Sequence, residues 1–246
     1  MVTRTRQPTI PITEIEHAAF CKTEDELPAK SLAEELAVNI RWQQIPDSYL
    51  HLSAAELDER IHQARERLGK TVTILGHHYQ REEVIKYADF QGDSFLLSQE
   101  AASRPEASYI VFCGVHFMAE TACILCAPHQ KVVLPNITAG CSMADMAPME
   151  DVEDAWEDLQ DVLGDHGGIV PVTYMNSIAG IKALCGRNSG AVCTSSNATA
   201  VLKWAFQEAD RVLFLPDQHL GRNTGLKLGI PLNEICLLYT SPSPRD

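Results

Sequence analysis

Short apolar runs alternate with helical stretches over most of this chain, and this alternation limits the possible fold more than any other feature. The runs are TVTIL (71–75), YIVFC (109–113), KVVL (131–134), IVPVTY (169–174), AVC (191–193) and RVLFL (211–215). Continuous runs rich in β-branched residues are typical of strands buried on both faces. Strands that alternate with helices form βαβ units, which build parallel sheets.

The connecting stretches have helical patterns. We predict helices at about 82–88, 94–103, 116–126, 150–163, 177–184 and 197–208. A further helix is predicted ahead of the first run. Ser53 and Glu56 have the spacing of a capping box, and Gly69 is placed to end the helix. The chain is therefore predicted to be α/β, with parallel sheets covered by helices on both faces.

The stretch 150–163 separates two groups of strands. It is acidic, with an apolar stripe made by Val152, Trp156, Leu159 and Leu163. We interpret its acidic side as a solvated face. We predict a first α/β domain at 53–149 and a second at 150–235. Residues 1–52 are predicted to be an N-terminal extension that is partly helical.

The charge balance narrows the range of partners. Twenty basic and 33 acidic residues give a formal net charge of −13, which argues against nucleic acid or an anionic membrane as the main partner. No apolar run is long enough to span a bilayer, and the first residues lack the apolar core of a secretory signal. We expect a cytoplasmic protein. In that compartment its eight cysteines are packed thiols or ligands rather than a disulfide framework.

Polar residues follow nearly every predicted strand. The segments are GHHYQ (76–80), GVHF (114–117), PNITAGCS (135–142), MNS (175–177), TSSN (194–197) and PDQHLGR (216–222). In open parallel sheets, ligands bind at the carboxyl ends of the strands. The pattern predicts a small-molecule site, although it does not name a reaction.

Several of these residues allow more than one interpretation. Cys141 is a packed thiol, a nucleophile or a metal ligand. Asn197 is interpreted as a helix N-cap, and Ser195 can direct its hydroxyl and backbone N–H at an anion. Cys123 and Cys126 have the spacing of a zinc or redox motif, but no second pair stands at matching spacing. We interpret these two cysteines as core residues.

Taken together, the strand-end motifs resemble the quinolinate synthase family, the A protein of bacterial NAD biosynthesis. The matching segments lie between about 72 and 234: ILGHHYQREEVIKYADFQGDSFLLSQ, YIVFCGVHFMAETACIL, VVLPNITAGCSMADMA, VPVTYMNSIAGIKALCG, VCTSSNATAVLKW and VLFLPDQHLGRNTG. Their number, order and position after strands make the resemblance specific. Residues 1–70 are less distinctive.

The resemblance implies a fold and a reaction. The fold has three-layer αβα domains with parallel sheets in a pseudo-symmetric repeat, and this chain would hold two of the family's three domains. The reaction condenses iminosuccinate with dihydroxyacetone phosphate to quinolinate, with loss of phosphate and water. L-aspartate oxidase would supply the iminosuccinate. Three cysteines, one from each domain, would hold a [4Fe-4S] cluster whose open iron acts as a Lewis acid.

The resemblance also implies catalytic residues. His77, in GHHYQ, is similar to the family's substrate-binding histidine. Tyr79, in the same motif, is similar to the tyrosine placed near the open iron for proton transfer. Tyr174, in TYMN, is expected to contact the substrate and to take part in the chemistry.

Further residues are implied to bind substrate or metal. Asn176 forms a substrate-contacting pair with Tyr174, and Ser94, in GDS, is similar to a serine that holds substrate oxygens. Ser195, in TSSN, is similar to the serine that binds a carboxylate at a helix N-terminus. Cys141, in AGCS, is implied to be the first cluster ligand.

The C-terminal sequence departs from the family. After Glu234 the chain reads ICLLYTSPSPRD, where a cluster cysteine followed by a histidine is expected. CLLYTSPSPRD also corresponds to a translated sequencing-library adapter, so we expect 236–246 to be an artefact tail. The third domain would then be missing, apolar surface would be exposed, and the chain itself would be inactive.

Two other functions stay open. One is a non-catalytic α/β module that captures a dicarboxylate or a phosphate at the strand ends. The other is a zinc protein that uses Cys123 and Cys126 with His116 or His129.

Overall fold

The computed structural model describes residues 45–164 and 168–238. The chain divides into two units, 1–51 and 52–246. In the first unit the described part contains one short helix, α3 (Asp47–Leu50). Most of the predicted N-terminal extension, 1–52, lies outside the described residues, as do residues 239–246 of the predicted tail. The second unit contains both sheets.

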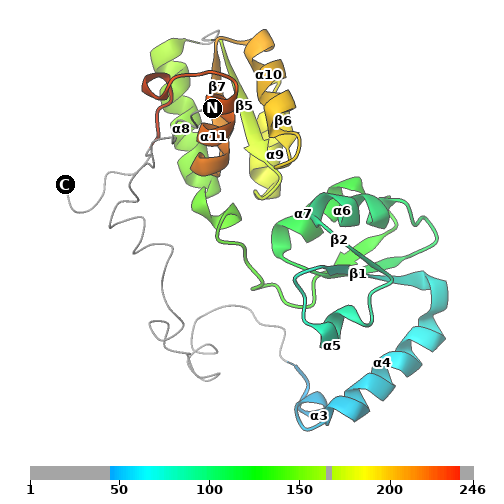
Figure 1. Ribbon diagram of the computed structural model, residues 1–246. Coiled ribbons are helices and arrows are strands. Elements are labelled where there is room, and N and C mark those ends of the chain that lie inside the picture. Colours follow the sequence, from blue (N-terminus) through cyan, green and yellow to red (C-terminus); the bar gives the residue numbers. More distant parts are fainter. Residues whose placement is uncertain (1–44, 165–167, 239–246) are drawn as a thin grey trace, which may run out of the picture. The chain divides into compact units, whose positions relative to one another are not determined.

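The first sheet has four parallel strands in the order β2-β1-β3-β4. The strands are β1 (Val72–His77), β2 (Phe90–Gly92), β3 (Tyr109–Cys113) and β4 (Lys131–Val133). The helices are α4 (Ala54–Leu68), α5 (Glu82–Ile85), α6 (Ser94–Ala102) and α7 (His116–Leu125). Short 3-10 turns lie at η2 (Gly69–Thr71) and η3 (Ala144–Met146). Helices α6 and α7 lie side by side (Figure 1).

The second sheet has three parallel strands in the order β6-β5-β7. The strands are β5 (Ile169–Tyr174), β6 (Ala191–Cys193) and β7 (Arg211–Leu215). The helices are α8 (Met149–Leu163), α9 (Ala179–Arg187), α10 (Ala198–Glu208) and α11 (Gln218–Lys227), and a 3-10 turn, η4 (Leu232–Glu234), follows them.

The two sheets repeat one strand order. In each, the first strand lies in the middle, the second lies on one side and the third on the other. Strand β4 extends the first sheet beyond this common pattern. The predicted α/β class with parallel sheets in a repeat is confirmed.

Alternation along the strands sends side chains to helices on both faces of the second sheet. Val212 and Phe214 of β7 pack in the core that includes α10, together with Leu220 of α11. Leu213 and Leu215 pack instead against α8 and α9. Because successive side chains point to opposite faces of a strand, this division is the three-layer arrangement. The core of the first sheet lies among β1, β3, α6 and α7.

Strand β2 and helix α11 were not predicted from the sequence. Residues 216–222 were predicted only as a polar segment after a strand, with no helix assigned. Helix α11 begins at Gln218 because the Asp217 carboxylate accepts hydrogen bonds from two backbone N–H groups of its first turn. Strand β2 has only three residues and no β-branched residue, so its sequence gives no strand signal. It is formed by pairing with β1.

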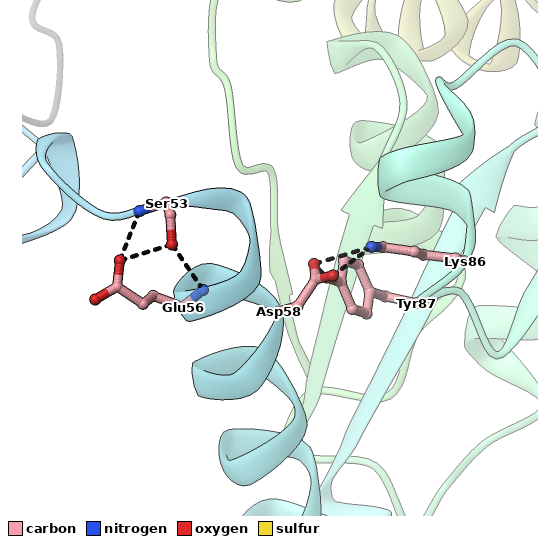
Figure 2. Close-up of polar contacts among 5 residues, drawn as sticks. All are labelled: Ser53, Glu56, Asp58, Lys86 and Tyr87. Atoms are coloured by element: carbon pink, nitrogen blue, oxygen red, sulfur yellow. Dashed lines mark hydrogen bonds and ion pairs between the residues drawn. The ribbon is translucent and has the colours of Figure 1, made fainter.

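Helix α4 begins at the predicted capping box and is held by side-chain contacts to the segment between α5 and β2. The Ser53 hydroxyl accepts from Glu56 N–H at 3.3 Å, and the Glu56 carboxylate accepts from Ser53 N–H at 2.8 Å (Figure 2). Further along, Asp58 accepts from the Lys86 ammonium at 2.8 Å and from the Tyr87 hydroxyl. These hydrogen bonds hold the pKa of Asp58 below its usual value.

No helix in the described part of the chain is both long enough and apolar enough to cross a membrane.

Replacing the cap should destabilise α4. Ser53→Ala removes the side-chain acceptor of the capping box, so we expect the free energy of unfolding in urea to fall by about 1 kcal/mol. Glu56→Gln keeps an acceptor that can reach Ser53 N–H and should cost less. Equal losses in the two variants would contradict this explanation.

A second prediction concerns Gly190, which lies directly before β6. A Cβ built there would lie 2.0 Å from the carbonyl oxygen of Pro171 and 2.9 Å from that of Cys185. Because both obstacles are backbone atoms, Gly190→Ala should lower the free energy of unfolding by about 3 kcal/mol. The measurement is urea unfolding followed by circular dichroism.

Gly186, inside α9, is the matched control. A Cβ at this position meets nothing within 4 Å. Gly186→Ala should therefore raise the free energy of unfolding by about 0.5–1 kcal/mol through helix propensity. A loss at Gly186 as large as that at Gly190 would refute the steric argument.

Candidate active site

The first group of candidate residues lies where β1 ends. His77 is the last residue of β1 and is buried, with 5% of its surface exposed. Its ring stacks on His78 at a centroid distance of 4.3 Å and lies 4.7 Å from the Tyr79 ring. Tyr79 is 84% exposed, so its hydroxyl is open to an incoming ligand.

Burial controls the charge of His77, and a backbone hydrogen bond controls its tautomer. Burial lowers the pKa of His77, the neighbouring His78 adds to this effect, and Asp93 opposes it. The imidazole is therefore neutral at pH 7. Tyr79 N–H donates to His77 Nδ1 at 3.4 Å, which leaves the proton on Nε2. His77 can thus donate a hydrogen bond to a substrate oxygen without carrying a charge.

Ser94 is the first residue of α6. The preceding residue, Asp93, caps this helix by accepting from Phe95 N–H at 3.1 Å and Leu96 N–H at 2.9 Å. The cap fixes the start of α6 and places the half-buried Ser94 beside the end of β2.

The second group lies at the end of the second sheet. Tyr174 is the last residue of β5, and its side chain is hydrogen-bonded to Ser195 in the turn between β6 and α10. Burial raises the pKa of Tyr174, although the bond to Ser195 opposes this. The phenol therefore stays protonated and can donate at pH 7.

Asn197 shapes the turn that carries Ser195. It occupies the predicted N-cap position of α10, but its side chain makes no hydrogen bond to that helix. Its Oδ1 accepts from Thr194 N–H at 2.7 Å instead. Asn197 is therefore at the predicted N-cap position, but the side-chain hydrogen bond expected of an N-cap is absent.

Cys141 lies in the loop after β4 and meets the second group. It is half-buried against the core of the first sheet, and Asp145 N–H donates to its carbonyl oxygen at 2.9 Å. The side-chain amide of Asn176 donates to Cys141 Sγ at 3.8 Å. Tyr174 packs against the same core and Met175 is buried in it. The structure thus brings Cys141 together with Tyr174, Asn176 and Ser195.

The two groups are separate in their bonding. Within residues 45–164 and 168–238, no hydrogen bond or ring contact joins His77, Tyr79 or Ser94 to Cys141 and its neighbours. The roles assigned to these residues from the resemblance stay predictions.

The interpretation of Cys123 and Cys126 as core residues is correct for Cys126 and wrong for Cys123. Cys126 packs against the core of the first sheet as predicted, but Cys123 is exposed. The physical reason is that Cys123 lies on the outward face of α7, whose inward face carries the buried Ala119 and Ala122, and Ile124 on the outward face is 59% exposed as well. Among the described residues, no three His, Cys, Asp or Glu side chains gather as a metal site.

Two residues near the site gave no clear signal in the sequence. The Glu120 carboxylate of α7 accepts from Ala179 N–H, at the start of α9, at 2.9 Å. The Lys182 ammonium of α9 donates to the Ser177 carbonyl at 2.5 Å and lies 5.4 Å from the Phe117 ring centroid. Burial lowers the pKa of Lys182 to about 8, against a raising effect of Glu120.

Comparisons with known proteins agree with these motifs. The family model described as "Quinolinate synthetase A protein" matches residues 59–241. The chain is 58% identical over 193 residues to the quinolinate synthase of Halalkalibacterium halodurans, covering 78% of this chain and 52% of the relative. It is 56% identical over 197 residues to that of Corynebacterium glutamicum, covering 80% and 50%. The chain thus spans about half the length of these curated relatives. It belongs to the quinolinate synthetase A protein family.

Proposed function

We propose that the protein containing this chain is a quinolinate synthase. It condenses iminosuccinate with dihydroxyacetone phosphate to quinolinate, with loss of phosphate and water, as a step of NAD biosynthesis. The proposal is supported by relatives that carry this name at 52–58% identity. The observation that carries it is the meeting of Cys141, Asn176 and the Tyr174–Ser195 pair at the strand ends.

The residues suit two anionic substrates. Ser195 presents a hydroxyl at the turn before α10, and Ser94 presents one at the start of α6. Both positions lie near backbone N–H groups that favour carboxylate or phosphate. Holding two reactants in a fixed geometry replaces an encounter in solution by a step within one complex, which is a large part of the rate gain.

The ring residues provide donors for proton transfer. Enolisation, imine closure and loss of water each move a proton to or from a substrate atom. His77 is held neutral with its Nε2 proton free to donate, and Tyr174 is held protonated by burial. Tyr79 is exposed and adds a third donor, its hydroxyl, beside His77. Groups of this kind act as general acids and bases when they lie within hydrogen-bond reach of the reacting atom.

Cys141 fits the role of one ligand of a [4Fe-4S] cluster. Its sulfur accepts the Asn176 amide N–H, and hydrogen bonds to ligating sulfurs are a means by which proteins tune such clusters. When bound, the cluster would supply an open iron that polarises a substrate oxygen as a Lewis acid. We propose that the other two thiolates come from outside the described residues, and that the 246-residue chain alone makes no quinolinate.

The setting of the reaction is part of the proposal. We place the enzyme in the cytoplasm and assign L-aspartate oxidase as the supplier of iminosuccinate. Neither nucleic acid nor membrane has a part in this function.

The first test compares iron content and activity. We expect the product of the intact gene, purified without oxygen, to show a cluster absorbance band and to form quinolinate from iminosuccinate and dihydroxyacetone phosphate. Cys141→Ala should lose both, because a cluster ligand is removed. The 246-residue chain should show neither.

Cys123→Ala is the matched control, since Cys123 is an exposed cysteine on α7. It should keep the iron and the activity. If Cys123→Ala lost them while Cys141→Ala kept them, the proposed ligand would be wrong. An intact protein that contains zinc and no iron would refute the cluster.

The second test concerns the Tyr174 hydroxyl. Tyr174→Phe keeps the packed ring and removes the group bonded to Ser195. In the intact enzyme we expect kcat to fall by about 10²-fold with little change in stability. Tyr109→Phe is the control. Tyr109 is the first residue of β3, whereas the candidate residues lie at the carboxyl ends of the strands, and it is 43% exposed. An unchanged kcat in Tyr174→Phe would remove this residue from the mechanism.

A further inference from the structure

Lys182 is a half-buried cation that the proposed chemistry does not use. It lies on α9, in the second sheet's part of the chain. Its ammonium donates to the Ser177 carbonyl at 2.5 Å and lies 5.4 Å from the ring centroid of Phe117. Phe117 is fully buried and belongs to α7, so Lys182 connects a loop before α9 with the core of the first sheet.

The surroundings explain how the half-buried Lys182 ammonium is tolerated. Helix α7 supplies the aromatic face of Phe117 and, one turn later, the Glu120 carboxylate. The Glu120 carboxylate also accepts from Ala179 N–H, which fixes the start of α9. Even so, burial dominates and lowers the pKa of Lys182 to about 8. Keeping an ammonium at such a position has a cost in free energy that a solvent-exposed lysine would not have.

The Ser177 carbonyl, to which Lys182 donates, lies at the end of the segment 174–177. This segment carries the candidate residues Tyr174 and Asn176. Tyr174 begins this segment, and its carbonyl accepts from the Ser177 hydroxyl at 2.8 Å. Met175 N–H donates to the Cys193 carbonyl at 2.7 Å, and Ser177 N–H donates to the Met175 carbonyl at 2.9 Å. Asn176 lies between these fixed points, with its amide directed at Cys141 Sγ. Lys182 therefore holds the far end of a short turn whose middle residue faces the thiol.

We propose that Lys182 is a positioning residue, which holds the Tyr174–Ser177 turn so that the Asn176 amide stays on the Cys141 sulfur. Its importance for catalysis rests on the proposed function, whereas the geometry itself can be measured on this chain without any reaction. The charged donor is the feature that matters, because the Ser177 carbonyl and the Phe117 ring both attract a cation.

The test follows the side-chain amide of Asn176 by NMR in the full 246-residue chain. Its resonances are assigned by their loss in Asn176→Asp. Lys182→Met keeps an apolar side chain of similar length and removes the donor. In Lys182→Met we expect the Asn176 amide resonances to move toward random-coil values, and their exchange with water to rise about tenfold through local opening. Lys182→Arg, which retains charge and donors, should restore the wild-type signals.

Two controls separate positioning from general packing. Lys203→Met changes an exposed lysine on α10 and should leave the Asn176 signals unchanged. Alkylation of the fully buried Cys185 on α9 reports unfolding of the helix itself, and it should stay slow in Lys182→Met. If Lys182→Met does not fold, Lys182→Leu replaces it and is interpreted in the same way, because leucine also lacks a donor.

The proposal is overturned by any of three results: unchanged Asn176 signals in Lys182→Met, equal effects of Lys182→Met and Lys182→Arg, or rapid alkylation of Cys185 together with the loss of the Asn176 signals. None of these depends on quinolinate formation. Failure of the proposed function and failure of this inference are thus distinguishable.

Discussion

The burial of Met175 in the core of the first sheet is the contact on which the candidate site depends. Met175 directly follows β5, the middle strand of the second sheet, yet it is 3% exposed among residues of β1, β3, α6 and α7. Burying a methionine side chain stabilises a fold by about 1.5–3 kcal/mol. Because its neighbours along the chain are Tyr174 and Asn176, this one insertion fixes both candidate residues beside Cys141.

The candidate site has neutral donors inside an acidic protein. The chain carries a formal net charge of −13, yet the proposed substrates are anions. Burial lowers the pKa of His77 and raises that of Tyr174, so both rings are uncharged donors at pH 7. Lys182 adds a single cation behind the Tyr174–Ser177 turn. Selection of the substrate would therefore depend on directed hydrogen bonds more than on the field of the whole protein.

Much of the fold could be predicted because its signals are local. Strands at 109–113, 169–174, 191–193 and 211–215 were predicted to the residue, since each is a short apolar run bounded by polar or turn-forming residues. Strand β2 and helix α11 were missed because FQG and QHLGRNTGLK carry no apolar periodicity. The contact between Cys141 and Asn176 could be expected because both residues follow the carboxyl ends of strands. The contacts of Glu120 and Lys182 could not be expected, because they form only where α7 packs against α9. That contact between distant segments leaves no pattern in either one.

The repeated strand order gives the candidate residues matching positions. His77 ends the middle strand of the first sheet, and Tyr174 ends the middle strand of the second. Ser94 follows the second strand of the first sheet and begins α6, while Ser195 follows the second strand of the second sheet and precedes α10. Each sheet thus presents one ring donor and one serine hydroxyl at equivalent places. The proposed reaction would join two anionic substrates, and a repeat of one α/β unit would provide two such sets of donors without a second kind of fold.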